Sequence, residues 1–248
     1  MSKKIYIFIL SIITIAVLSS CATTGKITPT PPEEPIENKK ENESQTTKRK
    51  PQPKSLKDKT YYLETDINYP VFEGRDLLNK AVENSILSYY NEFSKVAKTD
   101  WQQIKDSRED DEECPPFYYG TTNSYFTSKK YTSVLIKTEI FTGVAHPTTI
   151  LNAYNYDEDE KTLKRKITEI TGFTYSELSE LSRKALYSTL NKRGSIVDKD
   201  WIDSGTEPFP DNFEIFLMSD DFVYIYFEPY TVAPYSEGVL EISLKLKK

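Results

Sequence analysis

The chain folds around a C-terminal segment that reads Phe222-Val223-Tyr224-Ile225-Tyr226-Phe227 and continues as Glu228-Pro229-Tyr230-Thr231-Val232-Ala233-Pro234-Tyr235-Ser236-Glu237-Gly238. Its first six residues are apolar at both alternating positions, which is typical of a strand covered on both faces. Two prolines cannot donate to a strand ladder, so the second part is predicted to be a loop. Apolar and polar residues alternate over residues 240–246, which predicts a final strand with one buried face.

The residues before this segment predict an α+β domain. Apolar residues recur every three or four positions over residues 76–97, which indicates a long amphipathic helix. Thr174-Tyr175-Ser176-Glu177 matches a capping box and predicts the start of a shorter helix. Strand patterns cover residues 61–68, 117–125, 131–141 and 149–156, whereas residues 100–116 and 194–210 are predicted to be irregular. Strands and helices do not alternate regularly, so we expect an antiparallel sheet with one long and one shorter helix packed on a face.

Residues 1–20 are predicted to be a lipoprotein signal peptide. Two lysines precede an apolar run over residues 5–18, which is shorter than the roughly 20 residues that span a bilayer. Leu18-Ser19-Ser20-Cys21 resembles a bacterial lipobox, which predicts cleavage before Cys21 and acylation of that residue. An ordinary signal peptide followed by a chance cysteine is the alternative. We therefore expect an exported protein that is lipid-anchored at Cys21 to the bacterial cell membrane or outer membrane.

Residues 21–59 are predicted to be the lipidated cysteine and a disordered tether. Proline, threonine, glutamate, lysine and asparagine dominate this stretch, and large apolar side chains are almost absent. Such a segment buries too little surface to offset the entropy lost on ordering. The remaining residues, 60–248, are numerous enough for a single domain with its own core.

The predicted domain is acidic. The whole chain carries a formal net charge of −6, and residues 60–248 hold 21 basic and 32 acidic residues, a net charge of −11. This charge argues against binding to nucleic acid or to anionic polymers and favours a cationic partner. The competing explanation is that the negative charge serves only to keep the domain soluble.

Candidate catalytic residues are few. His146 is the only histidine, which excludes a zinc site built on two or three histidines, and no Gly-x-Ser-x-Gly motif is present. Cys114 follows five acidic residues, which disfavour a reactive thiolate. We therefore expect no catalytic residues, no metal site and no cofactor.

Four residues are candidates for ligand binding: Gly143, His146, Tyr230 and Tyr235. Tyrosine offers a large rigid surface with a polar tip, which suits the recognition of proteins and sugars. Tyr230 and Tyr235 flank the turn before the last strand, and His146 must lie in an extended or turn conformation because proline follows it. The alternatives are that the two tyrosines only pack in the core, and that His146 is a loop residue hydrogen-bonded to the backbone.

Three motifs carry a family resemblance. They are Tyr69-Pro70-Val71-Phe72, then Phe141-Thr142-Gly143-Val144-Ala145-His146-Pro147 followed by Tyr154-Asn155-Tyr156-Asp157, and the segment from Phe227 to Gly238. Together they resemble the extracellular region of lysozyme-responsive anti-sigma-V factors, a module also found N-terminal to some peptidoglycan deacetylase domains. The chain departs from the family at Val144, where a second glycine is usual.

The resemblance implies an α+β fold and, in the anti-sigma members, binding of lysozyme. It implies neither signalling nor deacetylation, because those need a cytosolic segment and a separate domain. We expect a non-enzymatic envelope lipoprotein whose tethered domain binds a ligand such as a cationic, lysozyme-like protein. A peptidoglycan- or glycan-binding module of the cell envelope is the alternative, and a cell-wall hydrolase or deacetylase accessory is the second alternative.

Overall fold

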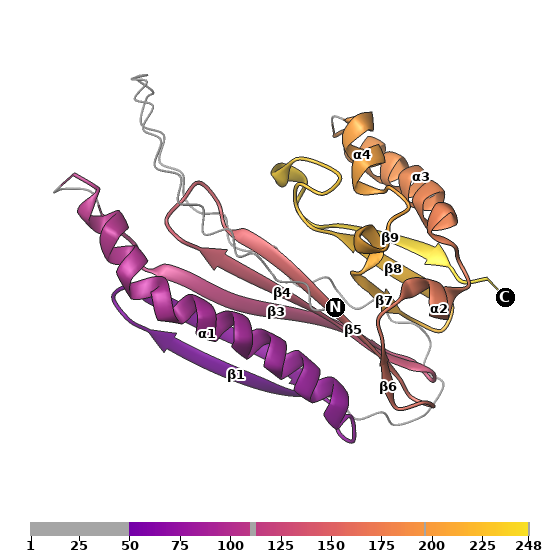
Figure 1. Cartoon of the computed structure of the whole chain (residues 1–248), viewed down its shortest axis with the longest axis horizontal. Coiled ribbons are helices and arrows are strands. Elements are labelled where there is room, and N and C mark those ends of the chain that lie inside the picture. The colour runs from indigo at the N-terminus through magenta and orange to yellow at the C-terminus, as the bar shows by residue number, and fades with distance from the viewer. Residues whose placement is uncertain (1–49, 110–112, 196, 248) are drawn as a thin grey trace. The chain divides into compact units, whose positions relative to one another are not determined.

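Two β-sheets and their helices build the folded part of the chain (Figure 1). The computed structural model describes residues 50–109, 113–195 and 197–247. The large sheet has six strands in sequence order, β1 (Gln52–Lys59), β2 (Leu63–Val71), β3 (Phe117–Thr127), β4 (Tyr131–Phe141), β5 (Thr148–Asp157) and β6 (Thr162–Lys164). The small sheet contains β7 (Phe216–Met218), β8 (Phe222–Phe227) and β9 (Leu240–Lys245).

The strand pairs are antiparallel except for β2 and β3, which run parallel. A parallel pair needs a long crossover, and the helix α1 (Asp76–Asp106) supplies it. The other helices are α2 (Ile167–Thr171), α3 (Tyr175–Arg193) and α4 (Lys199–Gly205), with 3-10 turns η1 (Pro210–Phe213) and η2 (Tyr235–Glu237).

The core has three parts, which define the layers. Leu78, Val82 and Ile86 of α1 pack on buried residues of β2, β3 and β4. Leu178, Leu186 and Leu190 of α3 pack on the outer face of the small sheet. A third cluster, formed by Leu135, Leu151, Leu217 and Tyr226, lies between the two sheets. The order of layers is therefore α1, large sheet, small sheet and α3, as Figure 1 shows.

Buried polar side chains fix the position of the two sheets. The Ser133 hydroxyl donates to Asn155 Oδ1 at 2.7 Å, and Asn155 Nδ2 donates to the carbonyl oxygen of Phe216 at 2.8 Å. The backbone N–H of Met218 donates to the Ser133 hydroxyl at 3.0 Å. Because a buried polar group that loses its partner is costly, these bonds favour one register between the sheets.

The predicted α+β class and most of the predicted elements are confirmed. The capping box is present, since Thr174 Oγ1 accepts from Glu177 N and Glu177 accepts from Thr174 N. Gly194 ends α3 in the left-handed conformation. The structure adds one feature that the sequence pattern does not show: β7 to β9 pair only with one another, so the strands divide into two sheets, with α1 on the large one and α3 on the small one.

The predicted boundary of the tether is wrong. Residues 52–59 form the edge strand β1, although all eight are exposed. They pair with β2, whose outer edge would otherwise lack partners, and Lys57 and Lys59 form ion pairs with Asp66 and Glu64. Pro53 lies opposite Pro70, beyond the residues of β2 that pair with β3, so neither proline interrupts that pairing.

Two predicted irregular regions contain helix. The helix α1 continues to Asp106 because Ala97 and Trp101 extend its buried face, and Trp101 Nε1 donates to the carbonyl oxygen of Pro115 at 2.9 Å. The helix α4 lies within residues 194–210 and is capped by Asp198. The helices of the described ranges include none with the length and apolarity that a bilayer crossing demands. The predicted signal peptide, Cys21 and residues 21–49 lie outside the described residues.

Candidate ligand-binding site

The turn between β4 and β5 meets the loop that follows β8 (Figure 1). The ring of His146 stacks on the ring of Tyr235, with centroids 3.8 Å apart and planes 17° apart. His146 Nε2 and the Tyr230 hydroxyl oxygen are 3.0 Å apart, within hydrogen-bonding distance. Two loops that are 84 residues apart in the sequence are thus joined through aromatic side chains.

The hydrogen bonds of His146 define its tautomer. Nδ1 lies 3.2 Å from the carbonyl oxygen of Pro147, which can only accept, so Nδ1 carries the proton. In the neutral ring Nε2 then accepts from the Tyr230 hydroxyl. The imidazole is therefore oriented at both nitrogens and presents a fixed ring edge beside two tyrosines.

Tyr230 has a strained backbone. Its φ is 70°, in the left-handed region that bulky residues rarely occupy. Such a conformation persists where the surroundings enforce it, and it is concentrated at functional sites. Here the Tyr230 N–H donates to the carbonyl oxygen of Ala233 at 3.1 Å, and Trp201 Nε1 donates to the Tyr230 carbonyl oxygen at 2.8 Å. The Tyr230 side chain remains 52% exposed.

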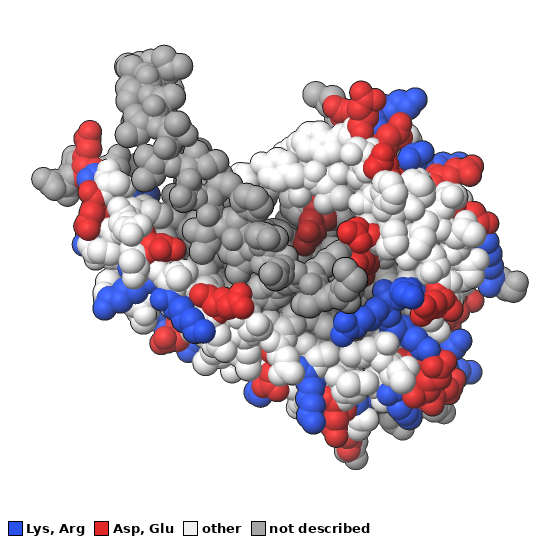
Figure 2. Space-filling model, viewed as in Figure 1, with Lys and Arg blue, Asp and Glu red and all other residues white. Residues whose placement is uncertain are grey.

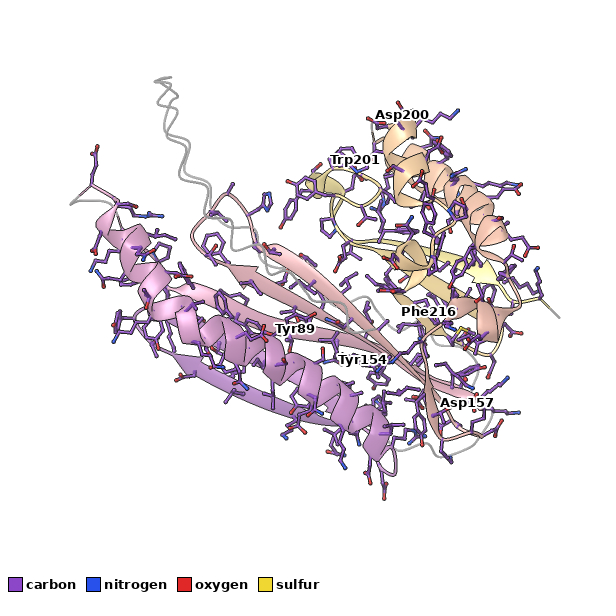
Figure 3. All side chains as sticks on the ribbon, viewed as in Figure 1. Tyr89, Tyr154, Asp157, Asp200, Trp201 and Phe216 are labelled. Atoms are coloured by element: carbon purple, nitrogen blue, oxygen red, sulfur yellow. The ribbon has the colours of Figure 1, made fainter. Side chains whose placement is uncertain are left out.

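The helix α4 brings Trp201 to the same place (Figure 3). The Trp201 and Tyr230 rings are nearly parallel, with centroids 6.4 Å apart. This approach depends on Gly205, because a Cβ at that position would lie only 2.1 Å from the carbonyl oxygen of Thr231. His146, Tyr230, Tyr235 and Trp201 together are called the aromatic cluster below.

A half-buried carboxylate anchors the loop after β8 to the large sheet. Glu228 Oε1 accepts from the backbone N–H of Leu151 on β5 at 2.6 Å. Burial raises the pKa of the Glu228 carboxyl, and the bond from Leu151 acts in the opposite direction. This contact links the loop to a position of β5 that the short strand β6, which pairs with residues 155–157, does not reach.

Gly143 and Arg108 lie beside the cluster. Gly143 has a φ of 78°, which the β4–β5 turn requires and which glycine adopts without strain. A Cβ at Gly143 would lie 3.7 Å from Arg108 Nη2, so the second residue after the end of α1 lies against this turn. Arg108 Nη1 donates to the Glu113 carbonyl oxygen at 2.7 Å, which holds the guanidinium in place. Gly143 thus shapes the turn without offering a side chain.

Charged groups adjoin the aromatic rings on β4. Lys137 Nζ and Glu139 Oε1 form an ion pair at 3.0 Å, and both side chains are more than a third exposed. Burial raises the pKa of the Tyr235 hydroxyl, and the nearby Glu139 carboxylate and Tyr230 raise it further. A ligand on the cluster would therefore find a carboxylate and an ammonium group next to the rings.

The structure brings the predicted site residues together, and the sequence did not point to two of their neighbours. His146, Tyr230 and Tyr235 come together, and Gly143 forms the turn that carries His146. Trp201 was missed because residues 194–210 were predicted to be irregular; the signal was Asp198, an N-cap residue three positions before a tryptophan. No sequence signal pointed to Arg108. Within the described ranges, no three His, Cys, Asp or Glu side chains are grouped to hold a metal ion.

The cluster can hold a flat, partly apolar ligand. Aromatic rings with polar tips contact apolar C–H surface with their faces and hydroxyl or amide groups with their edges. Figure 2 shows uncharged surface over the loop after β8, with acidic and basic side chains beside it over α3 and α4. A pyranose ring has the matching surface, since its C–H groups lie on its faces and its hydroxyl groups around its edge.

These features define a class of α+β domain with two packed sheets, and comparisons with known proteins place the chain near two families. The family model described as Deacetylase PdaC matches residues 56–149. The model described as Protein of unknown function (DUF3298) matches residues 163–247. The two matches follow each other along the chain. The first runs from within β1 to the start of β5, and the second runs from within β6 to the end of β9.

Individual relatives agree with these matches. The peptidoglycan-N-acetylmuramic acid deacetylase PdaC of Bacillus subtilis is 25% identical over 182 residues, which are 72% of this chain and 36% of that protein. This chain therefore corresponds to about a third of the relative's length. Crystal structures of DUF3298 family members from Bacteroides fragilis and Pseudomonas aeruginosa superpose with TM-scores of 0.53 and 0.54. Each is 17% identical; the alignments cover 79% and 81% of this chain and 90% and 92% of those chains, and they show a shared fold.

The predicted resemblance to a module linked with peptidoglycan deacetylases is consistent with these relatives. The resemblance to anti-sigma-V factors stays a prediction.

Proposed function

We propose that this chain is a non-enzymatic module of the bacterial cell envelope that binds the glycan chains of peptidoglycan. The aromatic cluster carries this proposal, because His146, Tyr230, Tyr235 and Trp201 offer fixed, partly exposed ring surfaces beside an ion pair. The name of the Bacillus subtilis relative supports it, since that enzyme acts on N-acetylmuramic acid in peptidoglycan. In this proposal a lipid at Cys21 holds the exported chain at the membrane, and no chemical step takes place on the ligand.

Sedimentation with purified peptidoglycan sacculi tests the proposal. We expect the full chain to sediment with sacculi, and we expect Tyr235→Ala and Trp201→Ala to reduce the bound fraction about tenfold or more, because each removes a ring face. Tyr125→Ala is the matched control. Tyr125 is 38% exposed and packs edge-on against Phe72, away from the cluster. Failure of the unaltered chain to sediment would refute glycan binding.

A cationic protein such as lysozyme is the second candidate ligand, and the net charge of −11 over residues 60–248 favours it. Attraction between opposite net charges weakens as salt screens it. We expect capture of lysozyme by the immobilised chain to fall when the salt concentration rises from about 50 to about 300 mM. Capture that does not respond to salt would remove the charge argument.

A further inference from the structure

The small sheet covers only part of the large one. On the face of the large sheet opposite α1, residues of β4 and β5 such as Leu135 and Leu151 are buried against β7 and β8. Toward β1 the same face is open. The Glu64 and Asp66 side chains of β2 are 42% and 41% exposed, and the Lys57 and Lys59 side chains of β1 are 70% and 69% exposed. This region is called the open face.

An aromatic ring lies on the open face. A Cβ at Gly120 would lie 2.1 Å from the hydroxyl oxygen of Tyr118 and 2.5 Å from its Cζ, so the end of the Tyr118 ring occupies the space above that glycine. Glycine at residue 120 allows the ring to lie down on the strand. Tyr118 is half-buried, so one part of its surface remains available to a ligand.

Charged groups on the open face are paired. Lys57 with Asp66 and Lys59 with Glu64 form ion pairs at 2.9 and 2.7 Å across β1 and β2. With the Lys137–Glu139 pair on β4, the face offers ammonium donors and carboxylate acceptors side by side and little local net charge. Such a surface suits an uncharged ligand with many hydroxyl and amide groups, because an acetamido group carries an N–H donor and a C=O acceptor.

The open face continues into the aromatic cluster through Glu139. Glu139 lies opposite Gly120 in the β3–β4 register, and β4 continues into the turn whose His146 ring stacks on Tyr235. Burial is the main cause of the raised pKa of the Tyr118 and Tyr235 hydroxyls, and the Glu139 carboxylate raises both further. Asp66 lies opposite Gly120 on the other side, in β2. Asp66, Gly120 with the Tyr118 ring above it, and Glu139 therefore form a row across β2, β3 and β4, and β4 leads into the turn that carries His146 of the aromatic cluster.

We propose that the open face and the aromatic cluster form one extended site, and that the ligand is a chain of several N-acetylated amino sugars rather than a single sugar. This inference rests on the proposed function. The cluster holds one part of the glycan, and Tyr118 with its neighbouring ion pairs holds sugars further along. Affinity for the glycan therefore increases with its length.

Titration calorimetry of the full chain with N-acetylglucosamine dimer, tetramer and hexamer tests the inference. We expect the hexamer to bind about tenfold more tightly than the dimer, as one further aromatic platform would provide. Tyr118→Ala removes that platform, and Gly120→Ala displaces the ring. Both variants should bind the dimer as the unaltered chain does and lose the tenfold gain. Tyr118→Phe keeps the ring and should keep the gain, which separates loss of the platform from loss of folding.

The outcomes separate the two proposals. Equal affinity for all three oligomers, with the dimer still bound, would overturn the extended site and leave the proposed function standing. The extended site would also be overturned if Tyr118→Ala kept the whole tenfold gain in affinity from the dimer to the hexamer. Binding of no oligomer would refute glycan binding together with the extension.

Discussion

Tyr230 combines a costly backbone conformation with an exposed side chain. The left-handed conformation costs a non-glycine residue about 1–2 kcal/mol, yet Tyr230 has a φ of 70° and is 52% exposed. Its contacts are with His146, Tyr235 and Trp201, the other members of the aromatic cluster. An exposed residue held in a strained conformation agrees with the proposed role in ligand binding.

Replacement of Tyr230 by glycine tests whether its side chain serves ligand binding more than stability. Glycine adopts a φ of 70° without strain, so the loss of side-chain contacts is partly offset. We expect Tyr230→Gly to unfold in urea within about 1 kcal/mol of the unaltered chain but to sediment poorly with sacculi. Retention of sacculus binding by this variant would show that the Tyr230 ring is not part of the site.

Glu228 should make the stability of the domain depend on pH. Burial raises the pKa of its carboxyl above the unfolded value of about 4.3. The folded state therefore favours the protonated form; the associated stability is fully present below the unfolded pKa and is lost as pH rises through the folded pKa. Glu228→Gln stays uncharged and can still accept from Leu151 N–H, so we expect it to be more stable than the unaltered chain at pH 7.

Urea midpoints at pH 7 and at about pH 4 measure this effect, and the difference between the two proteins should shrink at the lower pH. Glu180→Gln, at an exposed position of α3, is the control and should change neither midpoint. If Glu228→Gln were less stable than the unaltered chain at pH 7, the predicted direction of the stability change would be wrong.

Among the elements, β1 shows how a strand can form from a sequence typical of disorder. Its eight residues bury no side chain, and the large sheet holds them through backbone pairing and lysine–carboxylate pairs, including Lys54 with Glu83 of α1. A chain that begins at residue 60 lacks this strand and exposes the edge of β2. We expect it to lose about 2 kcal/mol or more of unfolding free energy relative to a chain that begins at residue 50, because several ladder hydrogen bonds disappear.

Urea unfolding of the two truncated chains measures the contribution of β1. Equal unfolding free energies would mean that β1 adds nothing to the fold. Light scattering gives a second reading, since an uncovered strand edge favours association between molecules.

The position of α4 depends on Gly205. A methyl group there would meet the Thr231 carbonyl oxygen at 2.1 Å, so helix and loop would have to separate. We expect Gly205→Ala to lower the unfolding free energy by about 1–3 kcal/mol and to weaken sacculus binding by displacing Trp201. Gly172→Ala is a useful comparison, since nothing lies within 4 Å of a Cβ there, although its φ of 71° brings strain. It should lower stability without weakening binding.

At the scale of the whole folded unit, the first family match ends at the start of β5 and the second begins within β6, but the parts they cover pack together in one core. Asn155 of β5 bonds to Ser133 of β4 and to the backbone of β7, so it ties the small sheet to the large one. We expect Asn155→Ala to cost about 1–3 kcal/mol, because buried partners lose their hydrogen bonds.

Unfolding followed by tryptophan fluorescence and by circular dichroism checks this prediction and the unity of the fold. Trp101 and Trp201 report on the α1 side and the small-sheet side, respectively. We expect coincident transitions by both probes. Two separate transitions in the unaltered chain would show that the sheets unfold independently.

The sequence predicted local structure better than assembly. Periodicity and the capping box revealed α1, α3 and most strands, because these signals reside in neighbouring residues. Pairing of β1 with β2, the parallel β2–β3 pair and the division into two sheets depend on contacts between distant residues, which periodicity does not encode. For the site, loop tyrosines and the single histidine were recognisable, whereas Trp201 and Arg108 join through tertiary packing alone.

The exposed edge strand has a mechanical consequence. Tension applied through the chain that precedes Lys50 acts first on β1, whose side chains are all outside the core. Peeling of its eight residues would add roughly 27 Å of reach, at about 3.4 Å per residue, while α1 and the rest of the large sheet stay folded. If the protein is held at its N-terminal end and bound to a stiff wall polymer, β1 can detach and lengthen the chain when the two are pulled apart. The binding surface is then not disturbed until this extension is used up.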